Sequence, residues 1–149
     1  MASTASVQDE RLEVSGFILE RTAKKMKQAF QRFLKEIDAG ITADQWVVLD
    51  TLRKENGLSQ FEIAEIVFKD PPTLTRIIDL LCKKGLTRRI AHPDDRRRMK
   101  VCLTEKGEQL MQELRPQVKA FRKEGWNNLS ADDLQQLKRI LNTVYTNFE

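Results

Sequence analysis

Apolar and small residues in the first forty positions of the chain recur in steps of three and four. The positions are Leu12, Gly16, Leu19, Ala23, Met26, Phe30, Phe33 and Ile37. This spacing predicts one amphipathic helix, about 40 Å long at about 1.5 Å per residue. Because a small core covers only part of so long a stripe, we expect the rest to pack on a second copy of the chain. Gly40 is expected to end the helix in the left-handed position that follows the last turn.

Three shorter helical patterns follow, and each begins at a residue suited to cap a helix. Thr42 with Gln45 and Ser59 with Glu62 have the spacing of a capping box, and Asp70 precedes Pro71. Proline suits the first helical position, because the N–H that it lacks would be unpaired there. The third pattern carries Thr73, Thr75 and Arg76 close to its start. The last two helices, joined by a tight turn, are typical of a helix-turn-helix with its recognition helix.

The period changes to that of β-strands after Gly85. Residues 86–90 and 98–103 alternate between two faces, which predicts a two-stranded hairpin with one buried face. Two more helical patterns follow, capped by Thr104 and Ser130. A helix-turn-helix followed by a hairpin is a winged helix. We therefore expect a mainly α fold with a small β-hairpin.

The predicted hairpin and its flanks are strongly basic. Residues 83–100 hold eight Lys or Arg side chains and two carboxylates, a net charge of +6 in a chain whose total is +4. The rest of the chain is therefore slightly acidic. A local basic surface of this kind favours a polyanionic partner, and nucleic acid is the commonest one.

The length of 149 residues is that of an ordinary single domain, so we expect one domain over residues 1–149. Within it we predict a winged helix-turn-helix DNA-binding region at residues 41–104. The helices at 8–38 and 105–149 are predicted to be dimerisation helices. Their apolar stripes favour joint packing in a dimer interface, because the few elements between them are too small to cover both.

Composition argues against several other classes of protein. The sequence contains no run of about 18 apolar residues, so we predict no membrane span. The first six residues lack the features of an export signal, and we therefore expect a cytoplasmic protein. A single histidine, His92, and the lack of paired Cys or His spacing predict no metal site and no cofactor. Without a Gly-rich phosphate loop or a nucleophile elbow, we expect no enzyme. Cys82 and Cys102 are expected to be reduced, and an effect of their oxidation on DNA contact stays open.

The ordered motifs of the chain resemble those of one family. They are Ile41-Thr42-x-x-Gln45-Trp46-x-Val48-Leu49, Ser59-Gln60-x-Glu62-Ile63-Ala64, Thr73-Leu74-Thr75-Arg76, Lys83-Lys84-Gly85-Leu86, Asp95-Arg96-Arg97 and Leu103-Thr104-x-x-Gly107. In this order they resemble the MarR (multiple antibiotic resistance regulator) family of transcriptional regulators. The resemblance implies a homodimeric winged-helix protein that binds a pseudo-palindromic DNA operator as a repressor, often releasing it when a small ligand or an oxidant binds.

The resemblance also implies roles for individual residues. It places Thr73, Thr75 and Arg76 of the recognition helix in the major groove, where arginine can bind guanine with two hydrogen bonds. It places Arg97 of the wing in the minor groove and gives Asp95 the role of bracing the hairpin. Arg96, Arg98 and Lys100 are expected at phosphates, which supply affinity without sequence information. Lys83 and Lys84 are expected to cap the end of the recognition helix and to contact the DNA backbone at the same time.

Simpler interpretations of these side chains stay open. Arg76 and the wing cations are also consistent with a solvated surface, since exposed hairpins are often charged. Phe17, Trp46 and Phe121 are candidates for lining the site of a small aromatic or amphipathic effector, which family members hold between the dimerisation helices and the winged domain. Aromatic residues at helical spacing more commonly pack in a core. The alternative function is a winged-helix interaction module that contacts a protein or RNA partner.

Overall fold

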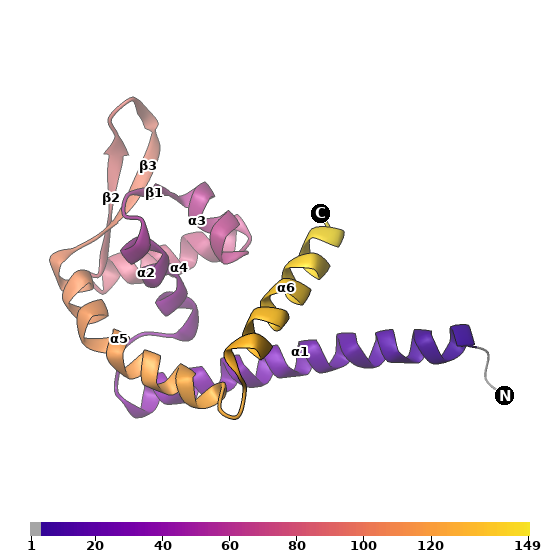
Figure 1. The fold of residues 1–149 in the computed structure, drawn as a ribbon. Coiled ribbons are helices and arrows are strands. Elements are labelled where there is room, and N and C mark those ends of the chain that lie inside the picture. Colours follow the sequence, from indigo (N-terminus) through magenta and orange to yellow (C-terminus); the bar gives the residue numbers. More distant parts are fainter. Residues whose placement is uncertain (1–3) are drawn as a thin grey trace. The chain divides into compact units, whose positions relative to one another are not determined.

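The computed structural model describes residues 4–149, with the side chain of Arg96 left out, and Figure 1 shows its fold. The described residues form six helices, α1 (Thr4–Glu36), α2 (Ala43–Lys54), α3 (Gln60–Val67), α4 (Pro71–Lys83), α5 (Glu105–Gly125) and α6 (Ala131–Asn147). They also form three strands, β1 (Leu58–Ser59), β2 (Thr87–His92) and β3 (Asp95–Leu103). The predicted fold class, mainly α with a small hairpin, is confirmed. Over residues 4–149, no helix is both long enough and apolar enough to cross a bilayer.

The chain divides into two compact units, and the boundary falls within α5, between Leu114 and Arg115. The first unit contains α1 to α4, the sheet and the start of α5, while the second contains the rest of α5 and α6. The region predicted to bind DNA, residues 41–104, lies wholly in the first unit. The assignment of the flanking helices to dimerisation stays a prediction.

The long first helix ends one residue earlier than its apolar pattern predicts, at Glu36. Asp38, with φ of 52°, takes the left-handed position, and the N–H of Ala39 donates to the carbonyl of Leu34 at 2.9 Å. The expectation that Gly40 would end the helix is therefore wrong. Gly40, with φ of 71°, takes a second left-handed conformation in the loop that follows. Aspartate tolerates this region better than most residues, so the helix closes before glycine is needed.

The predicted capping boxes form. Thr42 Oγ1 accepts the N–H of Gln45 at 3.1 Å, and Gln45 Oε1 accepts the N–H of Thr42 at 3.1 Å. Ser59 and Glu62 make the same reciprocal pair at 3.1 and 2.8 Å. Each box satisfies helix N–H groups that have no partner within the helix. The start of both helices is thus fixed by contacts between residues three positions apart.

One core joins the helix-turn-helix to the end of α1 and the start of α5. Its fully buried side chains include Leu34 of α1, Leu49 and Leu52 of α2, Ile63 of α3, Ile78 and Leu81 of α4, Val101 of β3 and Met111 of α5. The N-terminal half of α1 is different. Its apolar residues Leu12 and Phe17 are 65% and 63% exposed. Only the last third of the predicted stripe of α1 is covered within the first unit.

The sheet has a third strand that the sequence pattern does not predict. Its order is β1-β3-β2, and β1 pairs antiparallel with β3 through Leu58 opposite Val101 and Ser59 opposite Lys100. Two residues are too few to show an alternating period. Asn56 Oδ1 also accepts the N–H of Leu103 at 3.0 Å. The wing is therefore joined to the helix-turn-helix at its base by backbone and side-chain bonds.

Only the base of the hairpin is buried. Thr87 and Val101 are buried, whereas Ile90 and Met99, farther toward the turn, are 38% and 40% exposed. The expectation of one buried face along the whole hairpin is thus wrong for its outer half. The physical reason is that the outer half reaches beyond the helices α2, α3 and α4 and has nothing to pack against (Figure 1). A register shift between Ala91 and His92 precedes the turn.

Candidate nucleic-acid interface

The helix α4 is amphipathic, with one face in the core and the other in solvent. Its buried residues are Leu74, Ile77, Ile78 and Leu81. Its exposed residues near and beyond the first turn are Arg76, Asp79, Leu80 and Lys83. Pro71 and Pro72 open the helix, so its first turn has two fewer N–H groups to offer a phosphate. Contacts from α4 to an anion must therefore come mainly from side chains.

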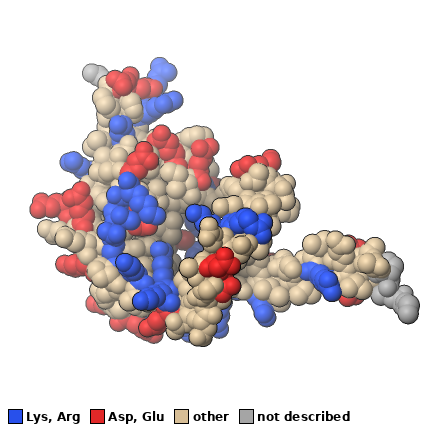
Figure 2. Space-filling model, in the orientation of Figure 1, with Lys and Arg blue, Asp and Glu red and all other residues tan. Residues whose placement is uncertain are grey.

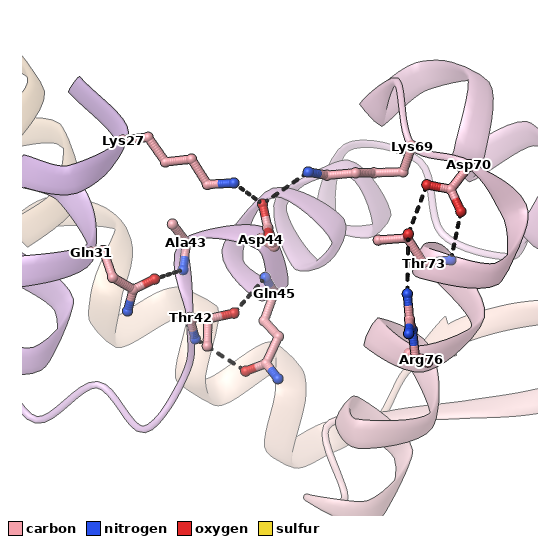
Figure 3. A network of polar contacts seen from close by, with 10 residues as sticks. All are labelled: Lys27, Gln31, Thr42, Ala43, Asp44, Gln45, Lys69, Asp70, Thr73 and Arg76. Atoms are coloured by element: carbon pink, nitrogen blue, oxygen red, sulfur yellow. Dashed lines mark hydrogen bonds and ion pairs between the residues drawn. The ribbon is translucent and has the colours of Figure 1, made fainter. Parts of the chain in front are cut away.

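The N-cap Asp70 organises the first turn of α4 (Figure 3). Its two carboxylate oxygens accept the backbone N–H of Thr73 at 3.0 Å and the Thr73 hydroxyl at 2.7 Å. The hydroxyl first, and then the N–H, lower the pKa of Asp70, so this carboxylate is ionised at neutral pH. Arg76 Nη2 lies 3.5 Å from Thr73 Oγ1, at the outer limit of a hydrogen bond. The hydroxyl proton of Thr73 is engaged, and the exposed Arg76 stands next to it.

Thr75 lies on the side of α4 that faces α3. Its hydroxyl donates to the carbonyl of Pro71 at 2.9 Å and accepts from Gln60 Nε2 at 3.2 Å. The residue is half-buried. In this conformation the hydroxyl has no proton left to donate to a base. Of the three predicted readers on α4, Arg76 is the one that is both charged and exposed.

A brace between α4 and the wing is formed by Arg89, Asp79 and Gln60. Arg89 of β2 donates from Nη2 to Asp79 Oδ1 at 2.6 Å and from Nε to Gln60 Oε1 at 2.7 Å. Arg89 is half-buried, while its neighbour Arg88 is exposed. Because successive side chains of a strand lie on opposite faces, at most one of these two arginines can face DNA. The brace directs Arg89 toward the helix-turn-helix.

The tip of the wing carries the predicted minor-groove arginine. Asp95 Oδ1 accepts the N–H of Arg97 at 2.9 Å, and Asp95 Oδ2 lies 4.0 Å from Arg98 Nε. This is the geometry that a bracing role for Asp95 requires. The side chains of Arg97 and Arg98 are exposed, and Lys100 is half-buried. The predicted contact of Arg96 lies outside the described side chains.

Charged side chains of both signs gather over the hairpin at the upper left of Figure 2. The exposed arginines of the tip belong to this group, together with the carboxylates of the turn. A projecting cationic element can enter a groove, whereas a flat patch can only lie along phosphates. The shape of the wing therefore adds to what its charge alone predicts.

The two lysines at the end of α4 differ in their surroundings. Lys83 is exposed. Lys84 Nζ donates to the carbonyl of Gly40 at 2.9 Å and to Gln45 Oε1 at 2.8 Å. Lys84 forms the C-cap of α4, as expected, but its amine is turned toward the protein in this conformation, which does not favour the expected contact with the DNA backbone. The residues that receive it lie about forty positions earlier in the chain, where local pattern gives no signal.

The three predicted effector-lining aromatic residues have different environments. Trp46 is 2% exposed and meets the ring of Phe30 edge to face, with centroids 6.1 Å apart. Its Nε1 is buried and has no acceptor within the described part of the chain. Phe17 is exposed, and Arg21 Cζ lies 5.8 Å from its ring centroid. Phe17 and Phe30 are about 20 Å apart along α1, so one protomer does not bring Phe17 to Trp46. Phe121, half-buried, belongs to the second unit.

Both thiols are unpaired, and no metal centre is formed by the described residues. Cys82 Sγ lies 3.3 Å from Thr87 Oγ1, and Cys102 is buried. No group of three or more His, Cys, Asp or Glu side chains within residues 4–149 is placed to hold a metal ion. The candidate interface consists of arginine, lysine and threonine side chains on α4 and the wing.

Comparison with known proteins gives the same picture. The sequence profile of the MarR family matches residues 41–99. BpsR of Bordetella bronchiseptica, whose DNA binding is regulated by 6-hydroxynicotinic acid, is 25% identical with a TM-score of 0.78, over 88% of this chain and 98% of that one. MepR of S. aureus in complex with DNA is 25% identical with a TM-score of 0.78, over 89% of this chain and 96% of that one. A mutant MarR of E. coli complexed with operator DNA is 29% identical with a TM-score of 0.74, over 87% and 91%.

Proposed function

We propose that this chain, of which residues 41–99 match the MarR family model, is a DNA-binding transcriptional regulator whose binding to DNA responds to a small ligand. The family resemblance inferred from its sequence motifs is confirmed by the profile match and by the similar structures. Since the matching family is one of transcriptional regulators, we infer that this chain regulates transcription and does not catalyse a reaction. The cytoplasm, which holds a bacterial chromosome, is the compartment in which it would act.

One observation supports this function above the others. A recognition helix and a projecting wing carry exposed arginines, Arg76 and Arg97, on one compact unit. In this proposal α4 lies in the major groove, with Arg76 at a base edge and Thr73 and Thr75 beside it. Arg97 enters the minor groove next to it. Lys83, Arg96, Arg98 and Lys100 bind phosphates.

A homodimer follows from the apolar residues left uncovered at both ends of the chain. On α1 they include Leu12, Phe17 and Leu19, and on α6 they include Ile140 and Val144. Isolated apolar residues are normal on a surface, but stripes at helical spacing mark an interaction site. A twofold dimer would bind a pseudo-palindromic operator with half-site centres about 34 Å apart, one helical turn of DNA. We propose repression by occupancy of such an operator.

In vitro selection on the purified protein, followed by anisotropy titration of the selected duplex, tests the function. We expect an enriched palindrome. We also expect affinity to fall by about a thousandfold between 50 and 200 mM salt if about six phosphates are neutralised. The absence of any enriched duplex, or a flat salt response, would contradict DNA as the partner. Preferential retention of RNA or of a protein would favour the interaction module instead.

The effector is proposed to bind near Trp46. A buried N–H without an acceptor is costly, and a polar ligand atom would relieve that cost. In a Trp126→Phe variant, Trp46 is the remaining tryptophan, so its fluorescence reports on this site alone. Titration with 6-hydroxynicotinic acid and with benzoic acid as probes is expected to quench it and to weaken operator binding. If both probes release DNA without changing Trp46 fluorescence, this location is wrong.

A further inference from the structure

The N-terminal end of α4 is attached to α1 through a single carboxylate (Figure 3). Asp44 Oδ1 lies 3.2 Å from Nζ of Lys69, the residue before the N-cap of α4. The same oxygen lies 2.9 Å from Nζ of Lys27 on α1. The backbone of Lys69 is also fixed, because its N–H donates to the carbonyl of Ala64 at 3.0 Å. The segment that leads into the recognition helix is thus held in place by a residue of α2 that α1 also contacts.

The C-terminal end of α4 is attached to the same region by a second lysine. Lys84, the C-cap of α4, reaches the carbonyl of Gly40 and Gln45 Oε1 at 2.9 and 2.8 Å. The Gln45 oxygen belongs to the capping box of α2 and also accepts the N–H of Thr42 at 3.1 Å. The carbonyl of Lys84 in turn accepts a bond from Lys106 Nζ of α5 at 2.8 Å.

Both lysines therefore reach one short stretch, residues 40–45, which we call the α1–α2 junction. This junction is itself joined to α1, because Gln31 Oε1 accepts the N–H of Ala43 at 2.8 Å. It follows that a displacement of α1 acts on both ends of α4 through polar contacts. A lysine at each end constrains translation and tilt of the helix together, which one contact in its middle would not do.

We propose that Lys69 and Lys84 are positioning residues that fix the recognition helix to the α1–α2 junction and so make its placement on DNA depend on α1. The proposal rests on the proposed function, because it assigns a route by which an event at α1 regulates DNA binding. Neither lysine contacts DNA in this assignment. The contacts are partly exposed, with side-chain exposures of 28% for Lys69 and 36% for Asp44. Partly exposed ion pairs are individually weak, so losing one is expected to lower the affinity for operator DNA several-fold.

The test compares Lys69→Met and Lys84→Met with the matched control Lys83→Met in the full-length protein. Anisotropy titrations of the selected operator are run over a range of salt concentrations. The control removes an amine assigned to a phosphate, so the salt slope should fall by about one for each half-site. Lys69→Met and Lys84→Met should weaken binding about three- to tenfold with the salt slope unchanged. A slope that falls as in the control, or an unchanged affinity, would overturn the proposal.

Asp44→Asn separates positioning from a plain effect of net charge. Because this change makes the protein more positive, a net-charge effect predicts tighter binding to DNA. Loss of the junction contact predicts weaker binding, by a factor similar to that of Lys69→Met. The double variant should be no weaker than either single one, since both remove the same contact. Tighter binding by Asp44→Asn would contradict the role of Lys69, and this variant also carries the test of Lys69 if Lys69→Met does not fold.

Hydrogen exchange without DNA distinguishes a failure of this proposal from a failure of the proposed function. Amides of residues 73–83 should exchange faster in Lys69→Met and Lys84→Met than in the wild type, and Lys83→Met should match the wild type. Equal exchange in all four proteins would overturn the proposal even if operator binding is found. Faster exchange in the two variants, together with no binding of any DNA by the wild type, would support the attachment of α4 to the α1–α2 junction. It would contradict the proposed function as a DNA-binding regulator.

Discussion

At the scale of single residues, the predicted readers differ in what their polar atoms already bind. The hydroxyls of Thr73 and Thr75 donate to Asp70 and to the carbonyl of Pro71. Arg76 and Arg97 are exposed and charged. Threonine hydroxyls near a helix start commonly make such local bonds, which compete with contacts to a ligand. Base recognition by this chain is therefore expected to depend on arginine more than on threonine.

Replacing the minor-groove arginine should separate DNA binding from folding. Arg97→Ala is expected to weaken operator binding at least about tenfold, since arginine is favoured in a narrow, electronegative minor groove. The far-UV CD spectrum and the dimer should be unchanged, because the side chain is exposed. Arg98→Ala is the matched control, with a smaller loss and a lower salt slope. Equal affinities of Arg97→Ala and the wild type in an anisotropy titration would remove the assignment.

Gly107 is required by a close approach of two backbones. A Cβ at this position would overlap the carbonyl oxygen of Leu86, which also accepts the N–H of Thr104 at 3.1 Å. Gly107→Ala is expected to lower the free energy of unfolding by about 1–3 kcal/mol, because a backbone carbonyl cannot move aside cheaply. Gly125→Ala is the control, since no atom lies within 4 Å of its added Cβ. Chemical denaturation of both variants gives the comparison, and equal midpoints would contradict it.

At the scale of elements, caps and periods predict where most helices begin, while the contacts between elements are not visible in the sequence. The capping boxes at Thr42 and Ser59 require only residues three positions apart. Strand β1 depends on pairing with β3, and the wing depends on the brace from Arg89 to Asp79. These elements position the wing against α4. The orientation of the wing relative to α4 is thus set by contacts between residues that are distant in the chain.

Removal of the brace should affect DNA binding more than stability. Asp79→Asn and Arg89→Gln are each expected to weaken operator binding several-fold, because the wing loses its fixed orientation to α4. The stability cost should stay below about 1 kcal/mol, since the side chain of Arg89 is 26% exposed and that of Asp79 is 57% exposed. The double variant should be no weaker than the single ones, and Arg88→Gln serves as the control on the same strand. Additive losses in the double-mutant cycle would show that the two residues act separately.

The junction carboxylate should hold its contacts over the whole physiological pH range. Burial acts to raise the pKa of Asp44, but hydrogen bonds from Lys27 and Lys69 outweigh it, so the pKa lies below the ordinary 3.8. A depressed pKa means that the stabilisation is present above the unfolded-state pKa and is lost as pH falls through the folded-state value. The stability difference between the wild type and Asp44→Asn should be constant from about pH 7 to 5 and shrink below about pH 4. A difference that already shrinks near pH 6 would refute this.

At the scale of the whole molecule, the uncovered apolar residues of α1 and α6 are the main feature that a single chain does not explain. Within the described chain, α6 has no buried residue, and Phe17 and Leu12 of α1 are largely exposed. The winged helix-turn-helix has its own core in the first unit. Dimer formation and the folding of the DNA-binding region are therefore expected to be separable.

A charge placed in the stripe of α1 should produce a folded monomer. Leu12→Glu combined with Phe17→Glu is expected to shift sedimentation from dimer to monomer, because a carboxylate in an apolar interface is costly. Operator affinity should fall at least about a hundredfold, since two half-sites are then no longer bound by one linked pair. Glu13→Gln is the control on the same helix. A dimer that persists in the double variant would place the interface elsewhere.

The fold class, the resemblance to the MarR family, most helix starts and the basic wing could all be predicted from the sequence, because caps, periods and local charge depend on residues close together in the chain. Which of the cations stay exposed depends on the packing of segments that are distant in the chain. Arg89 donates to Gln60, 29 positions away, and Lys84 donates to the carbonyl of Gly40, 44 positions away. The sequence shows that Arg89 lies on a wing strand and Lys84 at the end of a helix, but it does not show these partners. The same holds for β1 and for the approach of Gly107 to Leu86. Burial and pairing are set by packing of distant segments, and these decide whether an arginine or a lysine reads DNA or positions the helix that does.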